Sequence, residues 1–262
     1  MRLRTKFLIS LVLISVVLTA GTILIVQHSA RQQARDVTYH AMHNSLNTFQ
    51  NFQRQREQAL AQSAELLANL PALRALMTTG DEPTIQRGLA DSWRLAGSDL
   101  LVLADRTAKL IALQTVTAGF TRSAARDSLS HTLESGETRD WWFGGGHLYE
   151  VLVRPIYSGP ASDATRLGVL GVGYEIDDRV SGDIGRIASS HVAFRYGNEV
   201  VVSTLPASQQ VALSRETQIL SRGGDPQPVV IQLHRERFLA DSVVLTPGGT
   251  PAVSLTVLES YD

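Results

Sequence analysis

The chain opens with an apolar run that predicts a membrane-spanning helix. Residues 7–26 carry no charged side chain and consist mainly of Leu, Ile and Val. As a helix, this run is long enough to cross about 30 Å of hydrocarbon. Basic side chains lie within residues 1–6, so the positive-inside tendency predicts a cytoplasmic N-terminus. We therefore expect one anchor in the cell inner membrane, with residues 27–262 in the periplasm or another extracytoplasmic space.

A cleaved secretory signal is the alternative for the same run. The apolar region of such a signal is shorter, about 7–15 residues, and it ends at a small-x-small cleavage site. Residues 23–28 read ILIVQH and offer no clear site. The pattern therefore favours an uncleaved anchor.

Residues 27–70 predict one long stalk helix that leaves the membrane. No Gly or Pro occurs from residue 31 to residue 70, and Pro71 predicts the end of the helix. The apolar positions recur at helical spacings, but polar residues interrupt the stripe. The stripe has two interpretations. It covers a domain core, or it pairs two copies of the chain and carries a signal to the membrane. One helix can do both. The apolar positions are Met42, Leu46, Phe49, Leu60, Leu67 and Leu70, and the interruptions are Gln53, Arg56 and Ser63.

After Pro71 the pattern shortens and predicts an α+β module over residues 71–176. Two short helices precede two apolar runs that a short turn separates, which is typical of a hairpin. A further helix stops at Gly136, and two long strands follow it. The expected helices cover 73–77, 83–95 and 123–135, and the expected strands cover 99–105, 109–114, 148–156 and 167–176.

Residues 177–262 repeat this order in shorter form. Asp177 is the expected N-cap of a helix that reaches Ser189. The dipeptide Gly197-Asn198 predicts the turn of a hairpin. The fold class is therefore α+β, with two antiparallel-sheet modules in tandem. The expected strands cover 192–196, 199–205, 229–233, 238–245 and 253–258, and a further helical segment covers 208–221.

Composition and charge exclude several classes of protein. The chain has 24 Lys and Arg against 25 Asp and Glu, no Cys, and 44% hydrophobic residues. A nucleic-acid-binding protein usually carries a basic excess, so we expect no nucleic-acid partner. Disulfides and zinc–thiolate sites need Cys. A disordered chain would carry fewer apolar residues and a larger net charge.

No catalytic, cofactor or metal motif stands out. The sequence has no His-Glu-x-x-His, no Gly-x-Ser-x-Gly and no phosphate-binding Gly-Lys-Ser/Thr loop. We therefore assign no catalytic residue, no cofactor and no metal, and we expect no enzyme activity from the residues present. Gly171 and Gly173 point to one face of a predicted strand. That bare face suits close packing or, less favoured, the floor of a ligand cavity.

The segment from Arg139 to Gly146 is the least ordinary in composition. It holds Trp141 and Trp142, two of the chain's three Trp, followed by three Gly. A guanidinium beside an aromatic wall can grip a ligand carboxylate by two hydrogen bonds, and the glycines can flex as a lid. The alternative is a pair of aromatic side chains that caps a core, with glycines that only turn the chain.

Three residues on the following strands complete the candidate ligand-binding set. They are Tyr149, Arg154 and Tyr174. Tyr149 and Arg154 are separated by an odd number of positions, so they point to opposite faces of a strand. At most one of the two can line a given pocket.

The chain combines a basic start, one anchor and a long helix with a series of distinctive segments. These segments are ELLANLPALRAL, DLLVLAD, LYEVLVRPI, LGVLGVGYEID, HVAFRYGNEVVVSTL and SLTVLESYD. In this order they resemble the extracytoplasmic double Cache sensor domains of bacterial transmembrane receptors, over about residues 30–262. The resemblance implies two PAS-like modules on a stalk helix. Residues 71–176 would be the membrane-distal, ligand-binding module, and residues 177–262 the membrane-proximal module, mainly a coupling element.

The resemblance also implies parts that this chain does not show. Domains of this family precede a second membrane helix and a cytoplasmic output, often a histidine kinase, a diguanylate cyclase or a chemotaxis signaller. We therefore expect the chain to be a fragment of such a receptor. Some members that bind amino acids carry Arg-x-Trp and a further aromatic, which Arg139, Trp141 and Trp142 partly match. A downstream Tyr-x-Asp partner for the ligand's ammonium is not found.

The expected function is that of a membrane-anchored sensory module. It would bind a small molecule beside Arg139, Trp141 and Trp142 and signal through its helices, as a homodimer formed through the stalk. Two alternatives stay open from the sequence. One is a membrane-anchored extracytoplasmic hydrolase, and the other is an envelope scaffold protein without a small ligand.

Overall fold

The computed structural model describes residues 51–158, 165–216, 228–246 and 251–260. The predicted anchor and the first part of the predicted stalk lie outside these residues. Within the described ranges, no helix is both long enough and apolar enough to cross a membrane. The chain divides into two compact units, Met1–Asn44 and Ser45–Asp262, and every described residue belongs to the second.

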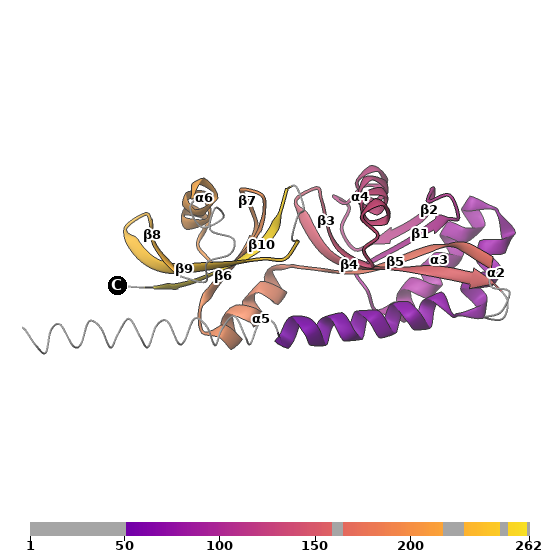
Figure 1. Ribbon diagram of the computed structural model, residues 1–262, viewed down its shortest axis with the longest axis horizontal. Helices are drawn as coiled ribbons and strands as arrows, with labels where there is room; N and C mark the ends of the chain where they lie inside the picture. Colours follow the sequence, from indigo (N-terminus) through magenta and orange to yellow (C-terminus); the bar gives the residue numbers. More distant parts are fainter. Residues whose placement is uncertain (1–50, 159–164, 217–227, 247–250, 261–262) are drawn as a thin grey trace, which may run out of the picture. The chain divides into compact units, whose positions relative to one another are not determined.

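The first sheet has five antiparallel strands in the order β2-β1-β5-β4-β3 (Figure 1). The β1–β2 hairpin and the long β4–β5 pair form where the sequence predicts them. The edge strand β3 is an addition, because the sequence predicted no strand there. The strands are β1 (Leu100–Asp105), β2 (Leu110–Thr115), β3 (Arg139–Gly144), β4 (His147–Ser158) and β5 (Thr165–Glu175).

The glycines after β3 form a tight turn. Gly145 and Gly146 have φ of 61° and 82°, and they join β3 directly to β4. Positive φ at both central residues suits the two-residue hairpin turn that matches strand twist. A Cβ on Gly145 would lie 2.1 Å from the Gly119 carbonyl oxygen, so this turn is held closely. The structure thus has the chain-turning arrangement, one of the two interpretations of this segment.

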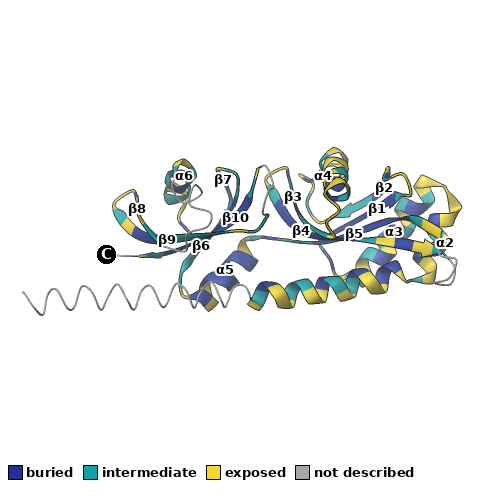
Figure 2. Cartoon of the chain, in the orientation of Figure 1, coloured by how far each residue is buried: buried dark blue, intermediate teal, exposed yellow. Residues whose placement is uncertain are grey.

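Helices cover both faces of the first sheet. The helix over 51–68, α2 (Pro71–Thr79) and α3 (Glu82–Ala96) pack on one face. The helix α4 (Arg122–Ser135) packs on the other. Pro71 starts α2 and so ends the long helix, as predicted. Figure 2 shows the buried residues along the sheet and the exposed ones on the outer sides of these helices.

The stripe on the long helix is an intramolecular packing stripe in its described part. Leu60 and Leu67 are 1% and 4% exposed and belong to the core under this face of the sheet. Gln53, one of the polar interruptions, is also buried. The interpretation of the stripe as a cover for a domain core is therefore confirmed for these residues.

The second sheet repeats the strand order of the first. Its order is β7-β6-β10-β9-β8, again antiparallel throughout. The helix α5 (Asp178–Ala188) starts at Asp177, whose side chain accepts a hydrogen bond from the Val180 N–H, as the N-cap prediction requires. The helix α6 (Ala207–Arg215) packs on one face through Leu213. The strands are β6 (His191–Tyr196), β7 (Glu199–Ser203), β8 (Val229–Leu233), β9 (Glu236–Val244) and β10 (Val253–Ser260).

Candidate functional site

The strand register separates the six predicted ligand-binding residues. Trp142 lies opposite Tyr149, whereas Trp141 lies opposite Glu150, which in turn lies opposite Tyr174. Because neighbours along a strand alternate between faces, Trp142 and Tyr149 share the face under α4. The other four point toward the face that carries the long helix. They are Arg139, Trp141, Arg154 and Tyr174.

Trp142 and Tyr149 fill the core under α4. Trp142 is fully buried, and its Nε1 donates a hydrogen bond to Thr132 Oγ1 at 2.9 Å. A Cβ on Gly171 would lie 3.4 Å from the Trp142 ring, which is ordinary van der Waals contact, so the indole packs directly against this bare strand face. The structure thus has a packed side chain, and not open space, next to Gly171. Trp142 is thus a fully buried core residue, and its place in a ligand site stays a prediction.

The Tyr149 hydroxyl is also satisfied within the chain. It hydrogen-bonds to the Thr117 hydroxyl and lies 3.3 Å from Thr115 Oγ1. Its ring packs edge-on against Phe120, with ring centroids 4.9 Å apart. Burial raises the pKa of Tyr149. The sheet face under α4 is thus closed by packed aromatic side chains at these positions.

A cleft of about 420 Å³ lies between β3 and α4 of the first module and β6 and the start of β10 of the second. Of the six predicted residues, only Trp141 lines it. Its other described lining residues come from α4, β3, β6 and the start of β10 with the segment before it. They are Ala124, Asp127, Ser128, His131, Asp140, Phe143, Tyr196, Thr246, Pro251 and Val253.

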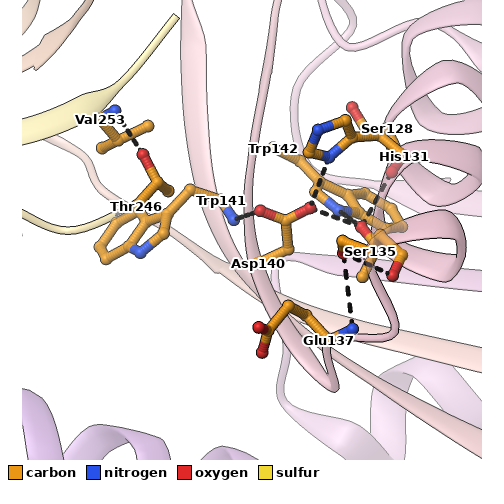
Figure 3. Close-up of polar contacts among 10 residues, drawn as sticks. Ser128, His131, Ser135, Glu137, Asp140, Trp141, Trp142, Thr246 and Val253 are labelled. Atoms are coloured by element: carbon orange, nitrogen blue, oxygen red, sulfur yellow. Dashed lines mark hydrogen bonds and ion pairs between the residues drawn. The ribbon is translucent and has the colours of Figure 1, made fainter. Parts of the chain in front are cut away.

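Asp140 ties α4 to β3 at the wall of this cleft. Its carboxylate accepts hydrogen bonds from Thr132 Oγ1 at 2.6 Å and from the Trp141 N–H at 2.7 Å. His131 Nδ1 lies 3.5 Å from Asp140 Oδ2. Figure 3 shows these contacts converging on Asp140 from both elements. Thr132 Oγ1 also accepts the Trp142 bond, so one network joins the cleft wall to the core.

The rest of the cleft is aromatic and negatively charged. Phe143 stacks on Tyr196, with ring centroids 4.3 Å apart. Trp141 is 6% exposed, and its Nε1 has no hydrogen-bond partner. Asp127 adds a second, exposed carboxylate, and no Lys or Arg occurs among the described lining residues. Carboxylates with aromatic faces attract cations.

On the sheet face that carries the long helix, a buried polar cluster joins β3 and β4 to that helix. Arg139 forms an ion pair with Glu57 of that helix, and its Nε lies 3.9 Å from Glu150 Oε1. Glu150 is 1% exposed. Burial raises the pKa of Glu150 to about 7, although the Arg139 charge works against this rise. Arg139, predicted to grip a ligand carboxylate, instead lies against two carboxylates of its own chain.

Polar residues that interrupt the apolar stripe of the long helix lie near this cluster. Gln53 is buried near Glu150, and the Arg56 guanidinium lies 5.7 Å from the centre of the Tyr174 ring. Tyr174 therefore contacts the helix and does not line the cleft. Arg154 lies opposite Leu170, further along β4, and is likewise absent from the cleft lining. Two of the three interruptions of the apolar stripe, Gln53 and Arg56, thus meet partners on the sheet.

Sequence reasoning missed Asp127, His131 and Asp140. Asp127 and His131 are four residues apart, so they share one face of α4. Asp140 immediately precedes the two Trp. The spacing of the first two and the position of the third could be read from the sequence. They indicate a shared site only once β3 is known to be a strand that lies beside α4. Because the sequence did not predict β3, it did not predict the cleft.

Comparisons with known proteins identify the architecture. A family model described as the double sensory domain of two-component sensor kinase matches residues 38–249. The periplasmic domain of Vibrio cholerae LuxQ has a similar fold, with a TM-score of 0.56 at 14% identity, over 84% of this chain and 99% of that one. A domain of a protein classed with the sensory box/GGDEF family from Vibrio parahaemolyticus gives a TM-score of 0.51 at 11% identity, over 86% and 95% of the two chains. The comparison with curated proteins gives no match.

Proposed function

The chain belongs to the family of double sensory domains of two-component sensor kinases, and we propose that it detects a small, positively charged molecule for a membrane-bound receptor. The family membership supports a sensory, extracytoplasmic domain with two PAS-like modules. Our proposal adds the ligand class, the binding cleft and the route of the signal. The receptor would be anchored through residues 7–26, would carry an output of the kinase, cyclase or chemoreceptor type, and would act as a homodimer through the stalk.

The observation that carries the ligand class is the lining of the cleft. Asp127 and Asp140 supply two carboxylates, and Trp141, Phe143 and Tyr196 supply aromatic walls. An ammonium group gains from both, because aromatic faces and carboxylates each attract positive charge. A volume of about 420 Å³ falls within the usual range of small-molecule sites.

The proposed signal passes through β3 to the long helix. Asp140 and Arg139 are neighbours on this strand and point to opposite faces. Asp140 lines the cleft, while Arg139 bonds to Glu57 of the long helix. A ligand that favours one position of β3 would therefore bias the contact between sheet and helix. This is a population shift, in which the ligand binds one arrangement better than the other.

The hydrolase alternative receives less support from the same cleft. Ser128, His131 and Asp140 all line it, and His131 faces Asp140. A nucleophilic serine must lie within hydrogen-bond reach of its histidine base. Within the described residues, no hydrogen bond joins the Ser128 hydroxyl to His131, and the Asp140 oxygen that faces His131 at 3.5 Å accepts its shorter hydrogen bond from Thr132. We therefore do not propose hydrolysis.

Replacing Asp127 by Asn is expected to weaken binding of organic ammonium ions about tenfold, because it removes one carboxylate from the cleft. Asp127 is exposed, so the substitution should leave folding intact. Calorimetric titration of the full chain in detergent with primary and quaternary ammonium ions measures the effect. Asp91→Asn changes another exposed aspartate, on α3 and outside the cleft lining, so it is the matched control and should bind like the wild type.

Two results would contradict the assignment of the cleft as an ammonium-binding site. One is that the wild-type chain binds no organic ammonium ion more tightly than sodium. The other is an equal loss of binding in the Asp127 and Asp91 variants, which would indicate a general charge effect and not a site.

A further inference from the structure

Arg195 is a fully buried arginine in the second module. It lies on β6 at 0% exposure, opposite Ser254 of β10 and Val200 of β7. It shares the sheet face of Ala193, which packs with Leu213 of α6. Arginine is almost never fully buried unless its charge is paired.

The guanidinium of Arg195 is poorly compensated. Its Nη1 and Nη2 both donate to one acceptor, the backbone carbonyl oxygen of Glu216, at 3.3 Å each, and its Nε has no partner. Across the described ranges, it forms no ion pair with Asp or Glu. Burial lowers the pKa of Arg195, although the negative charge of Glu216 works against this shift. A buried cation with this little compensation is costly to the folded state.

A second unpaired donor lies directly beside it. Ser254 is 0% exposed, and its hydroxyl has no hydrogen-bond partner. Thr256, two positions further on the same face of β10, is buried as well, but its hydroxyl lies 3.3 Å from Ser242 Oγ. The Arg195 Nε–H and the Ser254 O–H are thus two free donors next to one positive charge. Their chemical complement is an anion with oxygen acceptors.

We propose that the second module binds a small carboxylate at Arg195, with Ser254 as the second donor. A monoanion neutralises the single guanidinium, whereas a doubly charged phosphate would leave a buried negative charge uncompensated. A guanidinium also matches a planar carboxylate through paired hydrogen bonds. This site is separate from the acidic cleft beside β3, and its ligand has the opposite charge.

The two modules differ at this face despite their equal strand orders. In the first, the face under α4 is filled by Trp142 and Tyr149, whose polar groups are bonded within the chain. In the second, the face under α6 holds a buried cation and an unpaired hydroxyl. The second module is therefore more than a coupling element in this proposal.

Thermal unfolding of the full chain in detergent tests the site. The probes are acetate, propionate and benzoate, compared with chloride and with inorganic phosphate at equal ionic strength. A carboxylate that binds only the folded state should raise the wild-type Tm by about 5 °C when it is near saturation. Arg195→Met should abolish this rise. In chloride, the same variant should melt at or above the wild-type Tm, because an apolar side chain replaces an uncompensated charge.

Two further variants keep the test decisive. Ser254→Ala changes one small side chain, so it should fold even if the Met variant does not, and it should weaken the carboxylate effect several-fold. Arg215→Met removes an exposed arginine at the end of α6 and should respond to carboxylates like the wild type. The proposal is overturned if no carboxylate raises the wild-type Tm above chloride, if phosphate alone does so, or if the Ser254 and Arg215 variants respond alike.

Discussion

Replacing Glu150 by Gln should stabilise the chain at pH 8 and have little effect at pH 4. The folded chain keeps the Glu150 proton up to a pKa of about 7, whereas an unfolded chain releases it near 4.5. Between these values the folded state binds more protons, so its free energy of unfolding falls as the pH rises. Gln has no such proton to lose. The advantage of the variant should therefore grow to the order of 3 kcal/mol by pH 8.

Chemical denaturation of wild type and variant from pH 4 to pH 8 measures this difference. Glu137→Gln replaces an exposed carboxylate before β3 and serves as the control, with an expected change below about 0.5 kcal/mol at every pH. Arg139→Gln removes the positive charge that most favours ionised Glu150, so the pKa of Glu150 should rise further. A Glu150→Gln difference that does not vary with pH would show that this carboxyl does not titrate as a buried group.

Trp142→Ala should lower the free energy of unfolding by about 4 kcal/mol, because it empties the largest fully buried side-chain position in the described core. It also leaves Thr132 without its indole partner. Urea unfolding monitored by circular dichroism measures the loss.

Trp142→Phe separates the two contributions. It keeps an aromatic ring in the core and removes the hydrogen bond to Thr132, so a smaller loss of about 1–2 kcal/mol is expected. If Trp142→Ala unfolds at nearly the wild-type denaturant concentration, the indole is not a core element. Such a result would support the sequence-based prediction that Trp142 lines a ligand pocket.

The sequence predicted the regular elements well because their signals are local. Asp177 caps α5, Gly136 ends α4, and Pro71 separates α2 from the long helix. The strand β3 escaped because its composition, with two Trp and three following Gly, suggested a binding loop. A Gly-Gly turn that joins two strands produces the same composition.

The candidate site was predictable only in part. Alternation placed Tyr149 and Arg154 on opposite faces, as the register shows. Composition could not reveal that Arg139 faces Glu57, a residue more than 80 positions earlier on the long helix. It also could not reveal that Asp140, and not Trp142, faces the cleft. Such assignments depend on which long-range neighbours the fold supplies.

Hydrogen–deuterium exchange of the full chain, with and without an organic ammonium ion that binds it, tests the central claim most directly. The account predicts slower exchange in α4 and β3, which line the cleft, together with a changed exchange rate in the helix over 51–68. In the Asp127→Asn variant, both effects should shrink together. Slower exchange elsewhere with α4 and β3 unchanged, or a bound cleft with no response in the long helix, would contradict it.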